Sequence, residues 1–274
     1  MSWEPALAHV AALSSGAPLD PGLRVTVHFH PDRIFAGEPI LAAMARDGIY
    51  RSQFETGTGN GALNACPGGD RWRWESRMFG GAYDTASPST RPKYGSLNHR
   101  RRATGGSPRF GSAHLRMRRE TLERTTFCYP DSYLEPTDFG VASRMALIDL
   151  AEADEQDYLD DYIEAHVHGT VRFATDVEAL VLDPCYADTA VADLAAALAC
   201  PIEWHQGFVL SVDEFRRQPD YRGPEVIEAG LEIAQDGRLD ARIVGVAVNA
   251  GTHDPQTLKR VWHHVARFGG HRAV

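Results

Sequence analysis

Two short segments of the chain, Arg24–His30 and Tyr162–His168, alternate between apolar and polar side chains, and this pattern constrains the fold more than any other feature. Successive side chains of a strand point to opposite faces of a sheet, so each segment predicts a strand with one apolar face and one polar face. If the two strands lie close together, their polar stripes form a pocket on one face of the sheet. The stripes are Thr26, His28 and His30 in the first strand and Glu164, His166 and His168 in the second.

Other patterns along the chain predict an α+β fold, with a split mixed or antiparallel sheet and flanking helices. Helices are expected at Glu4–Ala12, Glu38–Arg46, Val141–Leu150, Ala190–Ala199, Pro224–Gln235 and Asp254–Phe268. Further strands are expected at His114–Arg118, Thr125–Tyr129, Val177–Leu182 and Pro201–Leu210. Arg51–Gly81 has no clean period and is expected to be loop and short strand. Thr85–Gly111 is rich in Pro, Gly, Ser and Arg, and we expect it to be the most mobile segment.

Basic residues are concentrated in one part of an acidic chain. The formal net charge is −9, yet Arg91–Arg119 holds nine Lys or Arg residues and no Asp or Glu. Asp149–Asp161, in turn, holds seven acidic residues and no base. A basic segment in an acidic protein indicates one anionic partner at one place. The alternative is a solvated loop that the acidic stretch partly neutralises, and the sequence leaves both interpretations open.

The composition indicates a protein that stays in a reducing compartment. No stretch reaches the roughly 18 consecutive apolar residues of a membrane-spanning helix, and Met1–Ser15 lacks the features of a secretory signal. We therefore expect no membrane association and a cytoplasmic location, unless the chain is exported without a cleaved signal. The cysteines form no CxxC pair and are expected to be free thiols rather than zinc ligands or disulfides. They are Cys66, Cys128, Cys185 and Cys200.

The two polar stripes allow three interpretations. The HxH and ExHxH strands could supply three or more ligands to zinc or iron and make the chain a metal-dependent hydrolase. The chain nevertheless lacks the repeated strand–helix rhythm of the β/α barrels in which such hydrolases occur. The histidines could instead be structural, hydrogen-bonded and inert. The third interpretation comes from three segments taken in order.

These three segments resemble the ADP-ribosyltransferases related to diphtheria toxin and the poly(ADP-ribose) polymerases. The first is the His28 strand, which leads into a helix that contains Ile40 and Leu41. The second is the sequence FGGAYD around Tyr83, followed eleven residues later by Tyr94. The third is the strand that carries Glu164. The whole chain also resembles a bacterial and fungal family of unknown function that reads FGGAYD, RPKYG and a Glu before HVHG.

The resemblance implies an ADP-ribosyltransferase-like core over residues 1–183, with residues 184–274 as a C-terminal α/β extension packed on it. It implies NAD+ as the substrate and no metal. The expected reaction is ADP-ribosyl transfer to a protein or nucleic-acid acceptor, or NAD+ glycohydrolysis where no acceptor is positioned. The basic segment is expected to meet the pyrophosphate or the acceptor. A non-enzymatic module that binds NAD or ADP-ribose remains an alternative.

The resemblance also assigns roles to individual residues. It implies catalytic roles for Glu164, His28 and Tyr83. The Glu164 carboxylate would stabilise the oxocarbenium-like state that forms when nicotinamide leaves, His28 would bond the adenosine-side ribose, and Tyr83 and Tyr94 would sandwich the nicotinamide ring. The residues implied in NAD+ binding are His28, Phe29, His30, Tyr83, Tyr94, Arg51 and His166.

The chain departs from the family pattern at two places. His30 stands where the family usually has Ser or Thr, and Pro31 after it has no N–H to offer a carboxamide, which favours His28 as the family histidine. The separation of His28 and Tyr83 is also longer than usual. Arg51–Trp74 is therefore expected to be an insertion that covers the site or packs against it.

Overall fold

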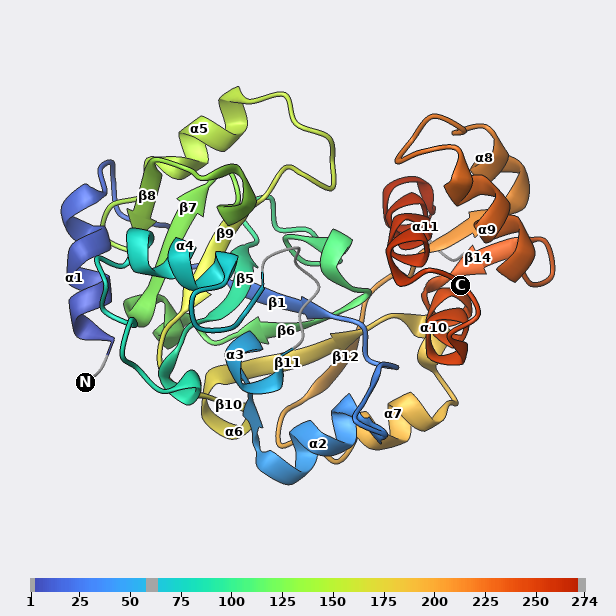
Figure 1. The fold of residues 1–274 in the computed structure, drawn as a ribbon, viewed down its shortest axis with the longest axis horizontal. Coiled ribbons are helices and arrows are strands. Elements are labelled where there is room, and N and C mark those ends of the chain that lie inside the picture. The colour runs from blue at the N-terminus through green and yellow to red at the C-terminus, as the bar shows by residue number, and fades with distance from the viewer. Residues whose placement is uncertain (1–2, 58–63, 271–274) are drawn as a thin grey trace.

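An eight-stranded sheet runs through the centre of the protein, which we describe for residues 3–57 and 64–270 of a computed structural model (Figure 1). The strand order is β12-β11-β6-β1-β5-β9-β7-β8. β11 and β12 pair in parallel and all other neighbours pair antiparallel, so the protein has a mixed α/β fold built on a mixed sheet. The strands are β1 (Val25–Phe29), β5 (Lys93–Leu97), β6 (Ala113–Met117), β7 (Thr125–Tyr129), β8 (Asp138–Val141), β9 (Ile163–Val167), β11 (Val177–Leu182) and β12 (Ile202–Trp204).

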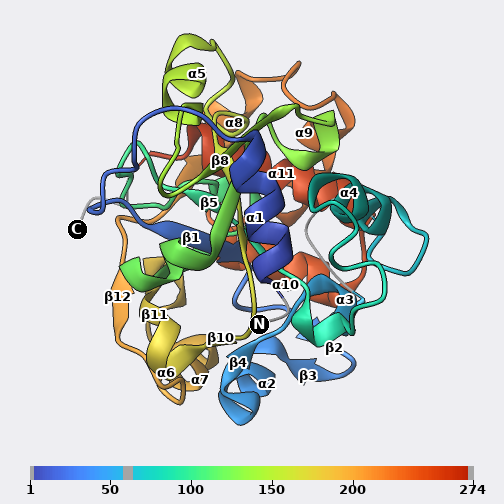
Figure 2. The same cartoon turned by 90° about the vertical axis from the view of Figure 1, so that its left-hand side faces the viewer.

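One face of this sheet is apolar and carries the main hydrophobic core. Val27 of β1 and Ala165 of β9 belong to it, as the alternation in the sequence predicts. Three helices cover this face: α2 (Ile40–Asp47), α5 (Leu147–Ala153) and α7 (Ala190–Ala195). α2 and α7 are far apart in the sequence but lie side by side in both views (Figures 1 and 2).

The other face is polar in its centre and is covered at one end by two further helices. These are α1 (Glu4–Leu13) and α4 (Asp70–Met78). They form a second core with residues of β7 and β8, in which Trp74, Phe79 and Tyr83 are almost fully buried. Figure 2 shows α1 in the foreground, beside β8.

The C-terminal residues form a small lobe with its own core beside the sheet (Figure 1). It contains β13 (Val209–Ser211), α8 (Val212–Arg216), α9 (Glu225–Ile233), β14 (Arg238–Asp240), α10 (Ala241–Ala250) and α11 (Pro255–Phe268). β12 also follows residue 183 but joins the main sheet, so the expected boundary at 183/184 separates two paired strands. The buried Trp262 of α11 donates a hydrogen bond from Nε1 to the Pro108 carbonyl, at 2.9 Å, and so ties the lobe to the sheet domain.

Several short elements complete the chain. They are β2 (Ile34–Phe35), β3 (Glu38–Pro39), β4 (Ile49–Tyr50), α3 (Gln53–Thr56), β10 (Val171–Arg172) and α6 (Phe173–Asp176). Short 3₁₀ helices lie at 88–90, 108–110, 119–124, 132–134 and 184–186. No described helix has both the length and the apolar character needed to cross a membrane.

The structure confirms most of the predicted elements and corrects four. The strand expected over Pro201–Leu210 is instead two short strands in different sheets, β12 and β13. β1 and β9 lie where expected, α2 ends at Gly48 in the left-handed conformation, and the Asp254 side chain caps α11. The segment 85–111 was expected to be mobile, but it contains β5, which is hydrogen-bonded on both sides. The segment 51–81 contains α3 and α4 rather than short strands. The helix expected from Val141 begins only at Leu147, because β8 extends to Val141.

Candidate functional site

The polar face of the sheet brings three sequence-predicted residues together. β5 lies between β1 and β9, with Ser96 opposite both Thr26 and Glu164. Because residues two apart in a strand share a face, His28, Tyr94 and Glu164 all project from this same side. The strand that carries Tyr94 therefore separates the histidine from the glutamate.

A cavity of about 840 Å³ opens on this face, within the size range of small-molecule and cofactor sites. Its lining includes His28, Tyr94 and Glu164. Three more of the predicted NAD+-binding residues also line it: Phe29, His30 and Arg51. Two predicted residues, Tyr83 and His166, are not part of the lining and lie fully buried behind it.

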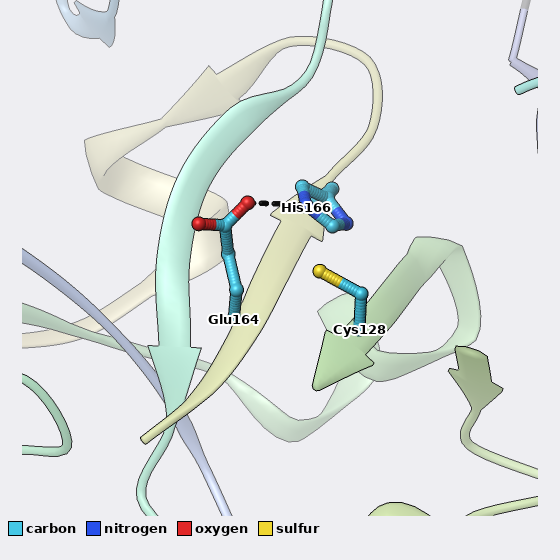
Figure 3. Close-up of side chains that lie close together, drawn as sticks. All are labelled: Cys128, Glu164 and His166. Atoms are coloured by element: carbon cyan, nitrogen blue, oxygen red, sulfur yellow. Dashed lines mark hydrogen bonds and ion pairs between the residues drawn. The ribbon is translucent and has the colours of Figure 1, made fainter. Parts of the chain in front are cut away.

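Glu164 is 7% exposed and is held by hydrogen bonds on both carboxylate oxygens. Oε1 lies 2.9 Å from His166 Nε2 (Figure 3), and Oε2 accepts from the Ser132 N–H at 3.3 Å and hydroxyl at 3.1 Å. Burial alone would raise the pKa of Glu164. The hydrogen bonds of His166 and Ser132 and the positive charge of Arg71 hold that pKa below its ordinary value instead. The carboxylate is therefore ionised at neutral pH.

A chain of buried hydrogen bonds runs from Tyr83 to Glu164. The Tyr83 hydroxyl lies 2.6 Å from His168 Nδ1, and Thr126 Oγ1 lies 3.0 Å from His168 Nε2 and 3.2 Å from His166 Nδ1. One set of proton positions satisfies every member: Tyr83 donates to His168, His168 to Thr126, Thr126 to His166, and His166 to Glu164. Tyr83 therefore does not form part of the cavity wall, and its connection to the site runs through this chain.

His28 is 6% exposed and has backbone partners on both ring nitrogens. Nδ1 lies 3.0 Å from the Gly111 carbonyl and Nε2 accepts from the Ser107 N–H at 3.3 Å. Burial lowers the pKa of His28 to about 4, against the raising effect of the Gly111 bond, so the ring is neutral. A Cβ on Gly105 would lie 2.3 Å from Nε2, so only glycine lets this loop close over the ring.

The sequence did not point to a buried charge cluster around Tyr94. Arg91 Nη1 binds Glu75 Oε2 at 2.5 Å, and the Tyr94 hydroxyl donates to Glu75 Oε1 at 2.9 Å. The Arg71 guanidinium lies over the Tyr94 ring, 4.0 Å from its centroid. Arg71 and Glu75 share one side of α4 with Trp74, and this spacing was the available signal. The expected insertion thus supplies a wall of the cavity, apart from residues 58–63, which lie outside the described residues.

Glu75 makes the stability of the fold depend on pH. Complete burial raises the pKa of Glu75 to about 7, although Arg91 opposes this shift. The folded state therefore holds a proton that the unfolded chain releases near its ordinary pKa of 4.5. The resulting contribution of Glu75 to the free energy of unfolding is greatest below pH 4.5 and is lost as the pH rises through 7. We expect urea denaturation to show up to about 3 kcal/mol of stability lost from Glu75 between pH 4.5 and 8. This loss should be absent in Glu75→Gln and retained in Glu178→Gln.

Most of the basic segment is paired with carboxylates of the same chain. Asp160 and Asp161, which belong to the acidic stretch, bind three of its arginines. These are Arg109, Arg100 and Arg102, while Arg91 binds Glu75, Arg101 binds Asp20, and Arg116 binds Glu178 and Glu203. The acidic stretch thus partly neutralises the segment, as the second interpretation predicts, but the segment is not a solvated loop, because it contains β5 and β6. The proposed anionic partner remains a prediction.

The histidine pairs do not converge as a metal centre. Within residues 3–57 and 64–270, Cys128, Glu164 and His166 form the one group of three potential ligands, with ligand atoms within 4.8 Å of one another (Figure 3). They come from β7 and β9, and β5 separates this group from His28. Burial raises the pKa of the Cys128 thiol well above its ordinary value, which disfavours the thiolate that a metal needs. The structure therefore does not bring the HxH and ExHxH side chains together as one set of ligands, and the metal-dependent hydrolase remains a prediction. All four cysteines are free thiols, as expected.

One family model matches nearly the whole chain. It is described as "Protein of unknown function (DUF3626)" and matches residues 24–155 and 141–268. A search among curated proteins finds no match.

Proposed function

The chain belongs to the DUF3626 family, whose description names no activity, and from the site itself we propose that the protein cleaves the bond between nicotinamide and ribose in NAD+. The ADP-ribosyl group would pass to a protein or nucleic-acid acceptor, or to water. One observation carries this proposal: His28, Tyr94 and Glu164 come from three adjacent strands, project from one face and line one cavity. On this proposal the sheet is the split sheet of an ADP-ribosyltransferase-like fold, and the free thiols suit a cytoplasmic location.

The cavity fits the proposed substrate in size and in chemistry. Its volume of about 840 Å³ lies in the range found for cofactor sites. Tyr94 offers an aromatic ring to the nicotinamide. Arg71 is 4% exposed, lines the cavity and has two buried N–H groups, Nε and Nη1, without a partner among the described residues. Such donors suit an anionic ligand.

The proposed reaction needs a fixed negative charge beside the reacting ribose. The C1′–N bond breaks, nicotinamide leaves with the electron pair, and an oxocarbenium-like ribose remains. An acceptor oxygen or nitrogen, or water, then bonds to C1′ and loses its proton. Glu164 would stabilise the positive charge of this state, because His166, Ser132 and Arg71 keep its carboxylate ionised.

The other residues would bind and orient the substrate. Arg71 covers one face of the Tyr94 ring, so nicotinamide would stack on the opposite face. His28 would bond the adenosine-side ribose by exchanging one of its two backbone partners. Tyr83 would orient the catalytic carboxylate through His168, Thr126 and His166, instead of stacking on nicotinamide as the resemblance implied.

The direct test is incubation of the purified chain with NAD+ and quantification of nicotinamide and ADP-ribose by mass spectrometry. We expect nicotinamide release that is unchanged by EDTA. Release that requires a metal would favour the hydrolase alternative. Binding of NAD+ or ADP-ribose in calorimetry without any nicotinamide release would contradict the proposal and favour a binding module.

Replacement of the two tyrosines should separate binding from positioning. Tyr94→Leu removes the stacking ring, and we expect KM for NAD+ to rise about tenfold. Tyr83→Phe removes only the hydroxyl that binds His168, so we expect kcat to fall with KM nearly unchanged. Steady-state kinetics of nicotinamide release measure both values. A large rise of KM in Tyr83→Phe would return Tyr83 to the ligand-contacting role.

A further inference from the structure

The C-terminal lobe completes one end of the cavity with positive charge. Arg222, which precedes α9, and Lys259 of α11 line the cavity together with Arg33 and Arg109 of the sheet domain. The Trp262 side chain fixes α11 against the turn that carries Arg109, through its bond to Pro108. Residues from three distant parts of the chain thus meet at this end, which we call the cationic end.

The described carboxylates only partly neutralise the cationic end. Asp160 accepts from both Arg109 and Arg222, with 2.8 Å between its Oδ2 and Arg222 Nη2. Asp157 Oδ1 also lies 3.9 Å from Arg222 Nη2, but the Asp157 carboxylate pairs with Arg267 as well. The pKa of Lys259 is lowered by burial and by the charges of Arg109 and Arg222. This lowering shows that the cations lie near enough to repel one another. An anion bound among them would relieve that repulsion.

Several donors at the cationic end also lack an acceptor. Arg33 Nη1, Arg109 Nε and Arg222 Nε are buried and have no hydrogen-bond partner among the described residues. Buried N–H groups are almost always bonded in folded proteins, so these three atoms indicate an acceptor that the described residues do not supply. Guanidinium groups are matched in shape and charge to phosphate oxygens, which accept several such bonds at once.

We propose that the cationic end is a phosphate subsite, completed by the C-terminal lobe, that binds the phosphate groups of a nucleotide. The identity of that nucleotide as a nicotinamide dinucleotide rests on the proposed function. The subsite itself follows from the four cations and from the unpaired donors of Arg33, Arg109 and Arg222. It gives residues 184–274 a part in ligand binding, because Arg222 and Lys259 are half of the cationic set.

The test compares ADP with adenosine, which lacks phosphate, in calorimetric titrations of the full chain. We expect ADP to bind at least tenfold more tightly than adenosine. Arg222→Gln should weaken ADP binding about ten- to one-hundredfold and leave adenosine binding unchanged. Arg260→Gln is the matched control, because Arg260 lies on α11 beside Lys259 but pairs with Glu225 at the surface. Inorganic pyrophosphate should compete with ADP.

Lys259→Gln provides a second variant in case Arg222→Gln unfolds, and both are checked by circular dichroism. Equal affinity for ADP and adenosine would overturn the phosphate subsite. So would a folded Arg222→Gln or Lys259→Gln protein that binds ADP within twofold of the unsubstituted chain. Titrations with NAD+ and NADP+ then identify the phosphate. If Arg222→Gln weakens the binding of NAD+ and NADP+ equally, the subsite binds the pyrophosphate. If it weakens only the binding of NADP+, the subsite binds the additional phosphate on the ribose.

The outcome is independent of turnover. ADP binding that depends on Arg222, in a protein that releases no nicotinamide, would contradict the proposed function and support the subsite. If the protein releases nicotinamide but Arg222→Gln changes neither ADP affinity nor KM, the proposed function is supported and the phosphate subsite is contradicted.

Discussion

Glu164→Gln is expected to lower the rate of nicotinamide release at least about 100-fold, with little change in KM for NAD+. Glutamine preserves the length and planarity of the side chain, and its oxygen still accepts from His166. Its NH2 group then faces the Ser132 N–H, so the change removes the negative charge and the hydrogen bond from that N–H. A charge that stabilises the oxocarbenium-like state more than the bound substrate acts on kcat, which stopped assays of nicotinamide release measure directly.

The matched control is Glu178→Gln. Glu178 lies on β11, outside the cavity lining, and pairs with Arg24 and Arg116. We expect its replacement to leave nicotinamide release within twofold. Unchanged turnover in a folded Glu164→Gln protein would remove the proposed role of the carboxylate and with it the assignment of the reaction.

The strands that carry the site could be predicted because their patterns are local. Apolar and polar side chains alternate within Arg24–His30 and Tyr162–His168 because one face of each strand packs in the hydrophobic core. Both segments form strands with the predicted faces. The strand between them was missed because its residues, Lys93–Leu97, include glycine and lie among prolines and arginines. Gly95 is required there, since a Cβ would lie 2.5 Å from the Thr26 carbonyl oxygen. A composition typical of loops thus conceals a central strand.

The walls of the cavity depend on contacts between distant parts of the chain. The pairing of Arg91 with Glu75 and the shared contact of Arg109 and Arg222 with Asp160 join residues far apart in the chain, so no periodicity in the sequence predicts them. Tyr83 illustrates the same limit. Its spacing from Tyr94 suggested two rings in one pocket, whereas Tyr83 points into the core between α4 and the sheet and meets His168.

The buried ion pair beside the site is expected to be the most sensitive point of the fold. Arg91→Met should lower the free energy of unfolding at pH 8, where Glu75 is ionised, by about 3–5 kcal/mol, because Glu75 would lose the cation that compensates its burial. Arg91 is 3% exposed and Glu75 is fully buried. Arg91 also donates to the Tyr83 carbonyl at 2.8 Å, so its loss affects the segment that carries Tyr83 as well. Urea denaturation followed by tryptophan fluorescence measures the change.

A double-mutant cycle separates the ion pair from the general cost of substitution. The double variant Arg91→Met with Glu75→Leu should be more stable than the sum of the two single losses predicts, since no uncompensated charge then remains buried. Arg73→Met is the control, because Arg73 pairs with Asp70 at the surface of the same helix and should cost less than about 1 kcal/mol. Additive losses would show that Arg91 and Glu75 do not stabilise one another, and Tyr94 would then be held by its ring contacts rather than by this pair.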